Sequence, residues 1–100
     1  MRHIVMMKLR DGCFEAAAEQ EYRETFEALK AALPEEILKV RVLRNVVSRP
    51  MNMDVMVEMK LRDASSLPKY LKHPLHVGIS EKYNPVVERI AMFDSEEEMP

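Results

Sequence analysis

The chain has 100 residues, a length that fits one small domain with a single two-layer core. Apolar residues make up 47% of it and charged residues 32%, an ordinary mixture for a soluble globular domain. The formal net charge of −2 gives no electrostatic reason to expect nucleic acid or an anionic membrane as a partner. No stretch approaches the roughly 20 apolar residues of a membrane span. The N-terminus reaches Lys8 and Arg10 too early for a signal peptide, so a cytoplasmic protein is expected.

Hydrophobic periodicity predicts two strands and a helix in the first half of the chain. Residues 3–10 alternate with apolar side chains on both faces, which is typical of a strand covered on both sides. An apolar stripe at three- and four-residue steps predicts a helix over residues 14–33, which Pro34 ends. Alternation over residues 37–47 predicts a second strand. The core face of that strand is expected to carry Leu38, Val40, Val42 and Val46.

The next segment predicts a hairpin and a broken helix. A turn at residues 48–52 and alternation over residues 53–61 predict a third strand that pairs antiparallel with the second. A serine at position 65 or 66 can cap a helix that breaks at His73-Pro74. Pro74 can then open a short following helix towards Lys82.

The closing segment predicts a fourth strand over residues 86–93, which completes a domain at residues 1–95 before an acidic tail at residues 96–100. The hexapeptides MKLRDG at residues 7–12 and MKLRDA at residues 59–64 both fall where a strand is followed by a helix. This repetition indicates two βαβ halves. Interleaved right-handed βαβ units in the order β-α-β-β-α-β predict an α+β ferredoxin-like fold with a four-stranded antiparallel sheet and both helices on one face.

The second face of such a sheet poses a problem of coverage. Because side chains alternate along a strand, several large apolar residues are expected on this second face, namely Ile4, Met6, Met56, Ile90 and Met92. An exposed apolar face of this size requires a cover. A second copy of the chain, packed sheet to sheet about a two-fold axis, is the simplest one, so a homodimer is predicted.

Three segments carry a resemblance to a known family over essentially the whole chain. They are HIVMMKLRDG at residues 3–12, YLKHPLHVG at residues 70–78 and FDSE at residues 93–96. On these residues the chain resembles the stress-responsive dimeric α/β barrel domain family. The resemblance implies a ferredoxin-like protomer and a dimer whose two sheets form a barrel. The family includes plant stress proteins and a plant polyketide cyclase that closes an aromatic ring by aldol condensation.

The resemblance also implies functional residues. Aldol ring closure needs a base that removes a proton next to a carbonyl and a donor that holds the oxyanion formed. By resemblance, His76 is the catalytic base and Tyr70 the catalytic hydrogen-bond donor. The predicted ligand-binding residues are His3, Val5 and His73.

Three interpretations of the function stay open from the sequence. The first is a homodimer that binds a small apolar or polyketide-like molecule in a pocket between helices and sheet. The second is an enzyme, cyclase-like or a lyase, that uses His76 and Tyr70. The third is a ligand-free structural or stress-response dimer, in which His73-Pro74 only breaks a helix and His3 is a hydrogen-bonded core residue.

A metal site and a cysteine-based site are not predicted. His73 and His76 have H-x-x-H spacing, but Pro74 changes the chain direction between them and no carboxylate lies at an obvious ligand offset. Cys13 is the only cysteine, which excludes an internal disulfide. The nine methionines are scattered over strand positions, which is typical of core filling. We therefore expect no cofactor.

Overall fold

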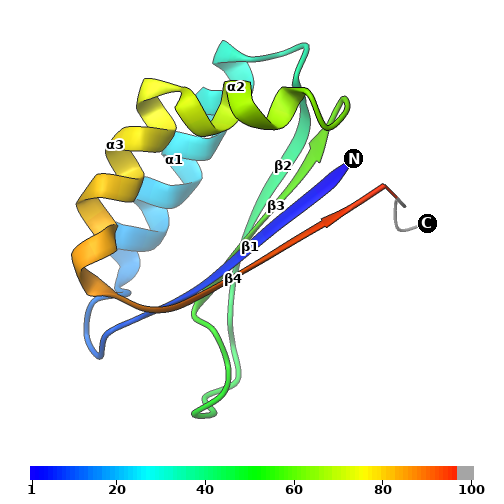
Figure 1. Ribbon diagram of the computed structural model, residues 1–100. Helices are drawn as coiled ribbons and strands as arrows, with labels where there is room; N and C mark the ends of the chain where they lie inside the picture. The colour runs from blue at the N-terminus through cyan, green and yellow to red at the C-terminus, as the bar shows by residue number, and fades with distance from the viewer. Residues whose placement is uncertain (97–100) are drawn as a thin grey trace.

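The computed structural model describes residues 1–96, which form one antiparallel sheet with its helices packed together on one side (Figure 1). The elements in chain order are β1 (Arg2–Leu9), α1 (Ala16–Ala32), β2 (Ile37–Arg44), β3 (Val55–Leu61), α2 (Ser66–Lys72), α3 (Pro74–Tyr83), the 3-10 turn η1 (Asn84–Val86) and β4 (Val87–Ser95). The strand order is β2-β3-β1-β4. This confirms the predicted ferredoxin-like α+β fold. Within residues 1–96, no helix is long and apolar enough to cross a bilayer.

Side-chain alternation in the two central strands builds the core. Every second residue of β1 and β3 is buried on the side that faces the helices. The stripe predicted for the first helix supplies the opposing layer, with Ala18, Tyr22, Phe26 and Leu29 buried. The two related hexapeptides do lie at equivalent places, one at the end of β1 and the other at the end of β3.

A β-bulge in β4 changes the face of the sheet to which the later side chains of this strand point. The register with β1 shifts so that Glu88 has no cross-strand partner. One extra residue moves every later side chain to the opposite face. Ile90 and Met92 therefore lie on the helix side, paired with Met7 and Val5, and the prediction that they lie on the open face is wrong.

A second bulge has the same effect in β2. Ile37 and Lys39 pair with adjacent residues of β3, so Leu38 is left between them without a partner. Ile37 is 1% exposed and occupies the core, whereas Leu38 is 41% exposed. The prediction that Leu38 lies on the core face is wrong for this reason.

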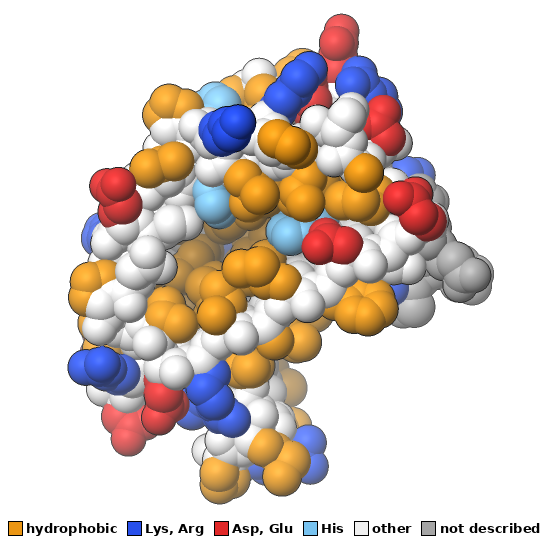
Figure 2. Space-filling model, in the orientation of Figure 1, with side chains coloured by type: hydrophobic (Ala, Val, Ile, Leu, Met, Phe, Trp, Pro, Cys, Tyr) orange, Lys and Arg blue, Asp and Glu red, His pale blue; other side chains and the backbone are white. Residues whose placement is uncertain are grey.

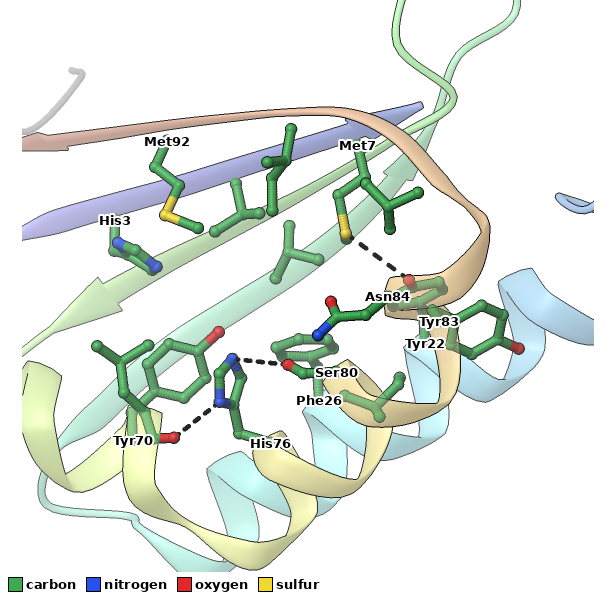
Figure 3. A pocket seen from close by; sticks show the side chains of 16 residues that line it. His3, Met7, Tyr22, Phe26, Tyr70, His76, Ser80, Tyr83, Asn84 and Met92 are labelled. Carbon is green, nitrogen blue, oxygen red and sulfur yellow. Dashed lines mark hydrogen bonds between the residues drawn. The ribbon is translucent and has the colours of Figure 1, made fainter. Parts of the chain in front are cut away.

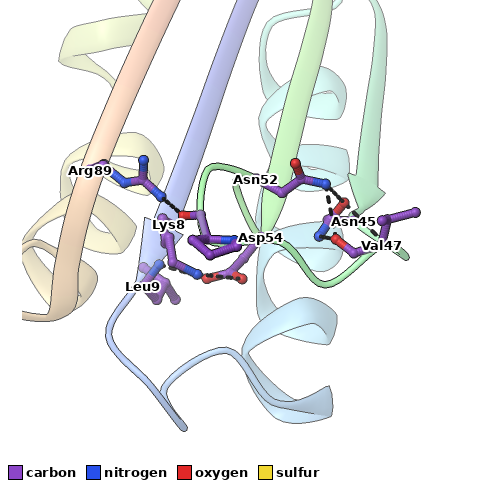
Figure 4. Close-up of polar contacts among 8 residues, drawn as sticks. Lys8, Leu9, Asn45, Val47, Asn52, Asp54 and Arg89 are labelled. Carbon is purple, nitrogen blue, oxygen red and sulfur yellow. Dashed lines mark hydrogen bonds and ion pairs between the residues drawn. The ribbon is translucent and has the colours of Figure 1, made fainter.

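The loop between β2 and β3 spans residues 45–54 and is longer than predicted. The Asn45 side chain donates a hydrogen bond to the Val47 carbonyl at 2.7 Å, and the Asn52 side chain donates to the same carbonyl at 3.0 Å (Figure 4). These side chains bond to the backbone locally and thereby compete with a strand ladder. Val46, which was predicted on the core face of the strand, is instead 83% exposed in this loop.

The sheet face opposite the helices carries a continuous apolar patch, which we call the open face. Its apolar residues are Ile4, Met6, Leu43, Met56, Ala91 and Phe93. Met6 pairs with Met56 on one side and with Ala91 on the other. Glu58 on the same face accepts hydrogen bonds from Arg41 and Arg2, which lower the pKa of its carboxyl group.

Candidate functional site

A cavity of about 240 Å³ lies between the helix side of the sheet and helices α1 and α3. Figure 2 shows it as a hollow with mostly hydrophobic side chains inside and histidines at its rim. Its opening is bordered by Ile90 and Met92 of the edge strand β4, which are 51% and 62% exposed. The lining residues from the sheet are His3, Val5, Met7, Val57, Val87, Ile90 and Met92. Those from the helical side are Tyr22, Phe26, Tyr70, Leu71, His76, Ile79, Ser80, Tyr83 and Asn84.

His3 lies at the beginning of β1, only 2% exposed, and forms a pair with Asp94 of β4. Its Nδ1 is 2.5 Å from Asp94 Oδ1. An ionised carboxylate only accepts hydrogen bonds, so Nδ1 carries the proton, and in this tautomer of the neutral ring Nε2 is an acceptor. This Nε2 is buried and has no partner within the described part of the chain.

Tyr70, near the end of α2, lies between the two histidines that line the cavity. Its ring centroid is 5.6 Å from that of His3 and 4.6 Å from that of His76. The hydroxyl points into the cavity (Figure 3), and no residue among 1–96 forms a hydrogen bond with it. Burial raises the pKa of Tyr70, so the group remains a protonated phenol, which is able to donate a hydrogen bond.

His76, in the first turn of α3, is held by its ring nitrogens on both sides. Nδ1 lies 2.9 Å from the Leu71 carbonyl, which can only accept, so Nδ1 is protonated. Nε2 lies 3.4 Å from the Ser80 hydroxyl and accepts from it. Burial lowers the pKa of His76, the hydrogen bond with Leu71 acts in the opposite direction, and the nearby His3 lowers this pKa because two imidazoles at one site disfavour a second positive charge. The result is a neutral imidazole with a basic Nε2 at the cavity wall.

The break between α2 and α3 explains why the Leu71 carbonyl is available to bond with His76. His73 adopts the extended backbone expected before a proline, and its Nδ1 accepts a hydrogen bond from the Leu75 N–H at 3.1 Å. In an unbroken helix that N–H would bond to the Leu71 carbonyl. Because His73 takes it, the Leu71 carbonyl is free for His76. The sequence HPLH thus turns a corner and also orients a histidine.

The structure brings together four of the five predicted site residues. His3, Val5, Tyr70 and His76 line the same cavity, whereas His73 does not line it and caps α3 instead. Among residues 1–96, no group of three or more histidine, cysteine or acidic residues is placed to hold a metal ion.

Two polar partners were missed by the sequence analysis. Asp94 is 91 positions away from His3, and only the register of β1 with β4 shows that they meet. Ser80 lies four residues after His76, a spacing at which helical neighbours touch, and that signal could have identified it.

The pKa of His76 leads to a prediction about stability. Its pKa in the folded protein lies below the ordinary 6.5, so on acidification the unfolded chain binds a proton that the folded chain excludes. The free energy of unfolding should therefore fall as the pH drops below about 6.5, with a slope under about 1.4 kcal/mol per pH unit, and level off below the folded pKa. Urea unfolding between about pH 5 and 8 measures this slope. His76→Gln should reduce it, and an unchanged slope in that variant would contradict the assignment.

Comparisons with known proteins place this chain in a family. The sequence profile of the stress responsive A/B barrel domain, abbreviated Dabb, matches residues 1–97. No curated protein matches the sequence. Three solved structures illustrate the fold similarity. A dimeric ferredoxin-like protein of unknown function from Bacteroides fragilis is 25% identical with a TM-score of 0.79, and the match covers 96% of this chain and 94% of the other.

The other two structures are more distant in sequence. A Dabb family protein with a ferredoxin-like fold from Mesorhizobium loti is 21% identical with a TM-score of 0.67, covering 98% and 96% of the two chains. A hydroxynitrile lyase from Passiflora edulis is 14% identical with a TM-score of 0.73, covering 99% and 95%. At these identities the similarity concerns the fold alone. From the profile match over nearly its whole length, the chain belongs to the stress responsive A/B barrel domain family.

Proposed function

We propose that this protein is a homodimer that binds a small, mostly apolar organic molecule in the cavity between its sheet and helices. The observation that carries the proposal is the convergence of an unpartnered Tyr70 hydroxyl and the basic Nε2 of His76 on one mostly apolar cavity. Apolar walls with a few convergent polar groups are typical of ligand sites. The cavity, at about 240 Å³, is smaller than the roughly 300–1,000 Å³ of pockets for drug-sized ligands, which favours a small ligand.

The open face supports the dimer. Its apolar patch lies at the centre of the sheet, where Met6 of β1 and Met56 of β3 are paired, and the exposed Arg41 of the edge strand β2 lies beside it. An apolar centre with a polar rim is the usual anatomy of a protein interface. The Bacteroides fragilis protein of the same fold is described as dimeric.

A residue at the cavity opening tests the binding proposal. Met92→Trp should lower the affinity for phenol at least about tenfold, because the larger side chain narrows the opening and fills space that a ligand would occupy. Leu75→Trp, on the exposed side of α3, is the matched control and should bind like the wild type. Titrations followed by the NMR signals of cavity residues measure both affinities. If phenol leaves these signals unchanged in the wild type, the ligand-free structural dimer is favoured instead.

A second candidate function is acid–base catalysis, either cyclase-like or of the lyase class. It is favoured by the protonation states of the site: His76 has a basic Nε2 whose one partner is the Ser80 hydroxyl at 3.4 Å, and Tyr70 is a neutral phenol. In an aldol ring closure, His76 Nε2 would remove a proton from the carbon next to a carbonyl, while Tyr70 donates to the enolate oxygen. The enolate carbon would then attack a second carbonyl of the same molecule, and the imidazolium would return the proton to the new alkoxide. The hydroxynitrile lyase from Passiflora edulis has a similar fold, and for this reason we include a lyase reaction in the proposal.

A further inference from the structure

We infer that Asp94 is a positioning residue that makes His3 an acceptor for a ligand hydroxyl, so that the cavity prefers alcohols, phenols or enols to ligands without an O–H. The inference rests on the proposed ligand-binding function and specifies the chemistry of the ligand. It assigns a role to Asp94, which lies in the FDSE segment but outside the predicted site residues and the His76–Tyr70 pair.

The placement of Asp94 is a consequence of the bulge in β4. Because Glu88 is an extra residue, the even-numbered positions that follow it face the helices, and Asp94 reaches the helix side directly opposite His3. Without the bulge the carboxylate would lie on the open face. The side chain of Asp94 is 42% exposed, whereas that of His3 is 3% exposed, so the carboxylate reaches inwards from the rim to hold a buried ring.

The unpartnered atom of this pair indicates a ligand. Buried polar atoms in folded proteins almost always have a hydrogen-bond partner, but within residues 1–96 His3 Nε2 has none. Asp94 holds the proton on Nδ1, so Nε2 can only accept. The missing partner is therefore a donor, and the cavity that His3 lines is where it can come from.

Tyr70 defines the other half of the recognition. Its ring lies beside that of His3, with 5.6 Å between the centroids, and its hydroxyl is a donor without an acceptor. One hydroxyl group of a ligand can accept from Tyr70 and donate to His3 Nε2 at the same time. A ketone or ether oxygen can only accept, which leaves His3 unpaired. A buried site that loses a hydrogen-bond partner discriminates strongly against the ligand that lacks it.

Two measurements test the inference. Long-range ¹H–¹⁵N NMR spectra of the imidazoles should show His3 protonated on Nδ1 in the wild type and on Nε2, at least in part, in Asp94→Ala. Phenol and fluorobenzene, which are similar in size, should differ in affinity for the wild type by about tenfold in favour of phenol, the size expected from one hydrogen bond. Asp94→Ala should weaken this preference, because only the hydrogen bond from Tyr70 remains, and should keep its affinity for fluorobenzene. Glu96→Ala removes a nearby exposed carboxylate and should behave like the wild type.

The outcomes separate this inference from the proposed function. If wild-type His3 is protonated on Nε2, or if phenol and fluorobenzene bind equally well, the assignment of Asp94 and His3 is overturned while ligand binding stands. If Asp94→Ala keeps the full preference for phenol, Asp94 is not the positioning residue. If neither compound binds, the proposed function is contradicted, and the preference for a hydroxyl falls with it. The inference is supported if wild-type His3 is the Nδ1–H tautomer and if Asp94→Ala reduces both the population of this tautomer and the preference for phenol.

Discussion

Replacement of both Met6 and Met56 by lysine should convert the protein from a dimer into a folded monomer at micromolar concentration. The two side chains are paired neighbours on the central strands of the open face, so two-fold packing brings four lysines into one interface. The dissociation constant should rise at least about a hundredfold, because like charges placed together across an interface cost several kcal/mol. Sedimentation equilibrium over a concentration series measures this change.

The matched control changes the same number of apolar side chains elsewhere. Leu75 and Val77 of α3 are each 39% exposed and lie outside the sheet, so their double replacement by lysine should leave the dimer intact. Circular dichroism and the NMR signals of the cavity report whether each variant is folded. A wild-type protein that sediments as a well-folded monomer contradicts sheet-to-sheet packing. So does a double methionine variant that dimerises as tightly as the wild type.

The order of the elements could be predicted because each depends on a local pattern. The stripe of α1 and the alternation of β1 and β3 are nearly ideal, and Pro34 and Pro74 fix where helices end and begin. The faces of β2 and β4 could not be predicted, because a bulge leaves no mark in the pattern of apolar residues. Leu38 and Glu88 are extra residues only with respect to a partner strand, and that pairing is a property of the whole sheet.

The candidate site, like the fold, could be predicted only in part from the sequence. Tyr70 and His76 lie close together in the sequence, and the resemblance to the family identified them before the structure showed a common cavity. The role of His73 as a cap and the freed carbonyl of Leu71 depend on hydrogen-bond competition, which a spacing pattern does not reveal. Asp94 depends on the register that the bulge in β4 sets, so only the three-dimensional structure reveals it.

His76→Ala should lower the rate of ring closure of a linear β-triketone by about 10²- to 10⁴-fold if the protein is a catalyst, which is the usual contribution of a general base. The physical reason is the loss of the basic nitrogen that lies beside Tyr70 and next to the Ser80 hydroxyl. Tyr70→Phe keeps the ring but removes the donor to the enolate oxygen. Its rate should fall by about 10²- to 10³-fold, the effect of losing one oxyanion donor.

Chemical rescue distinguishes a missing base from a damaged fold. His76→Ala leaves a space the size of an imidazole next to the Ser80 hydroxyl, so added imidazole should restore part of the rate in this variant and none in Tyr70→Phe. Leu75→Ala, one position earlier on the exposed side of α3, controls for disturbance of the helix and should keep the wild-type rate. Turnover that is unchanged in His76→Ala rules this residue out as the base. A wild-type protein that closes the ring no faster than buffer contradicts catalysis of this reaction, and the cavity is then a binding site whose basic nitrogen serves recognition alone.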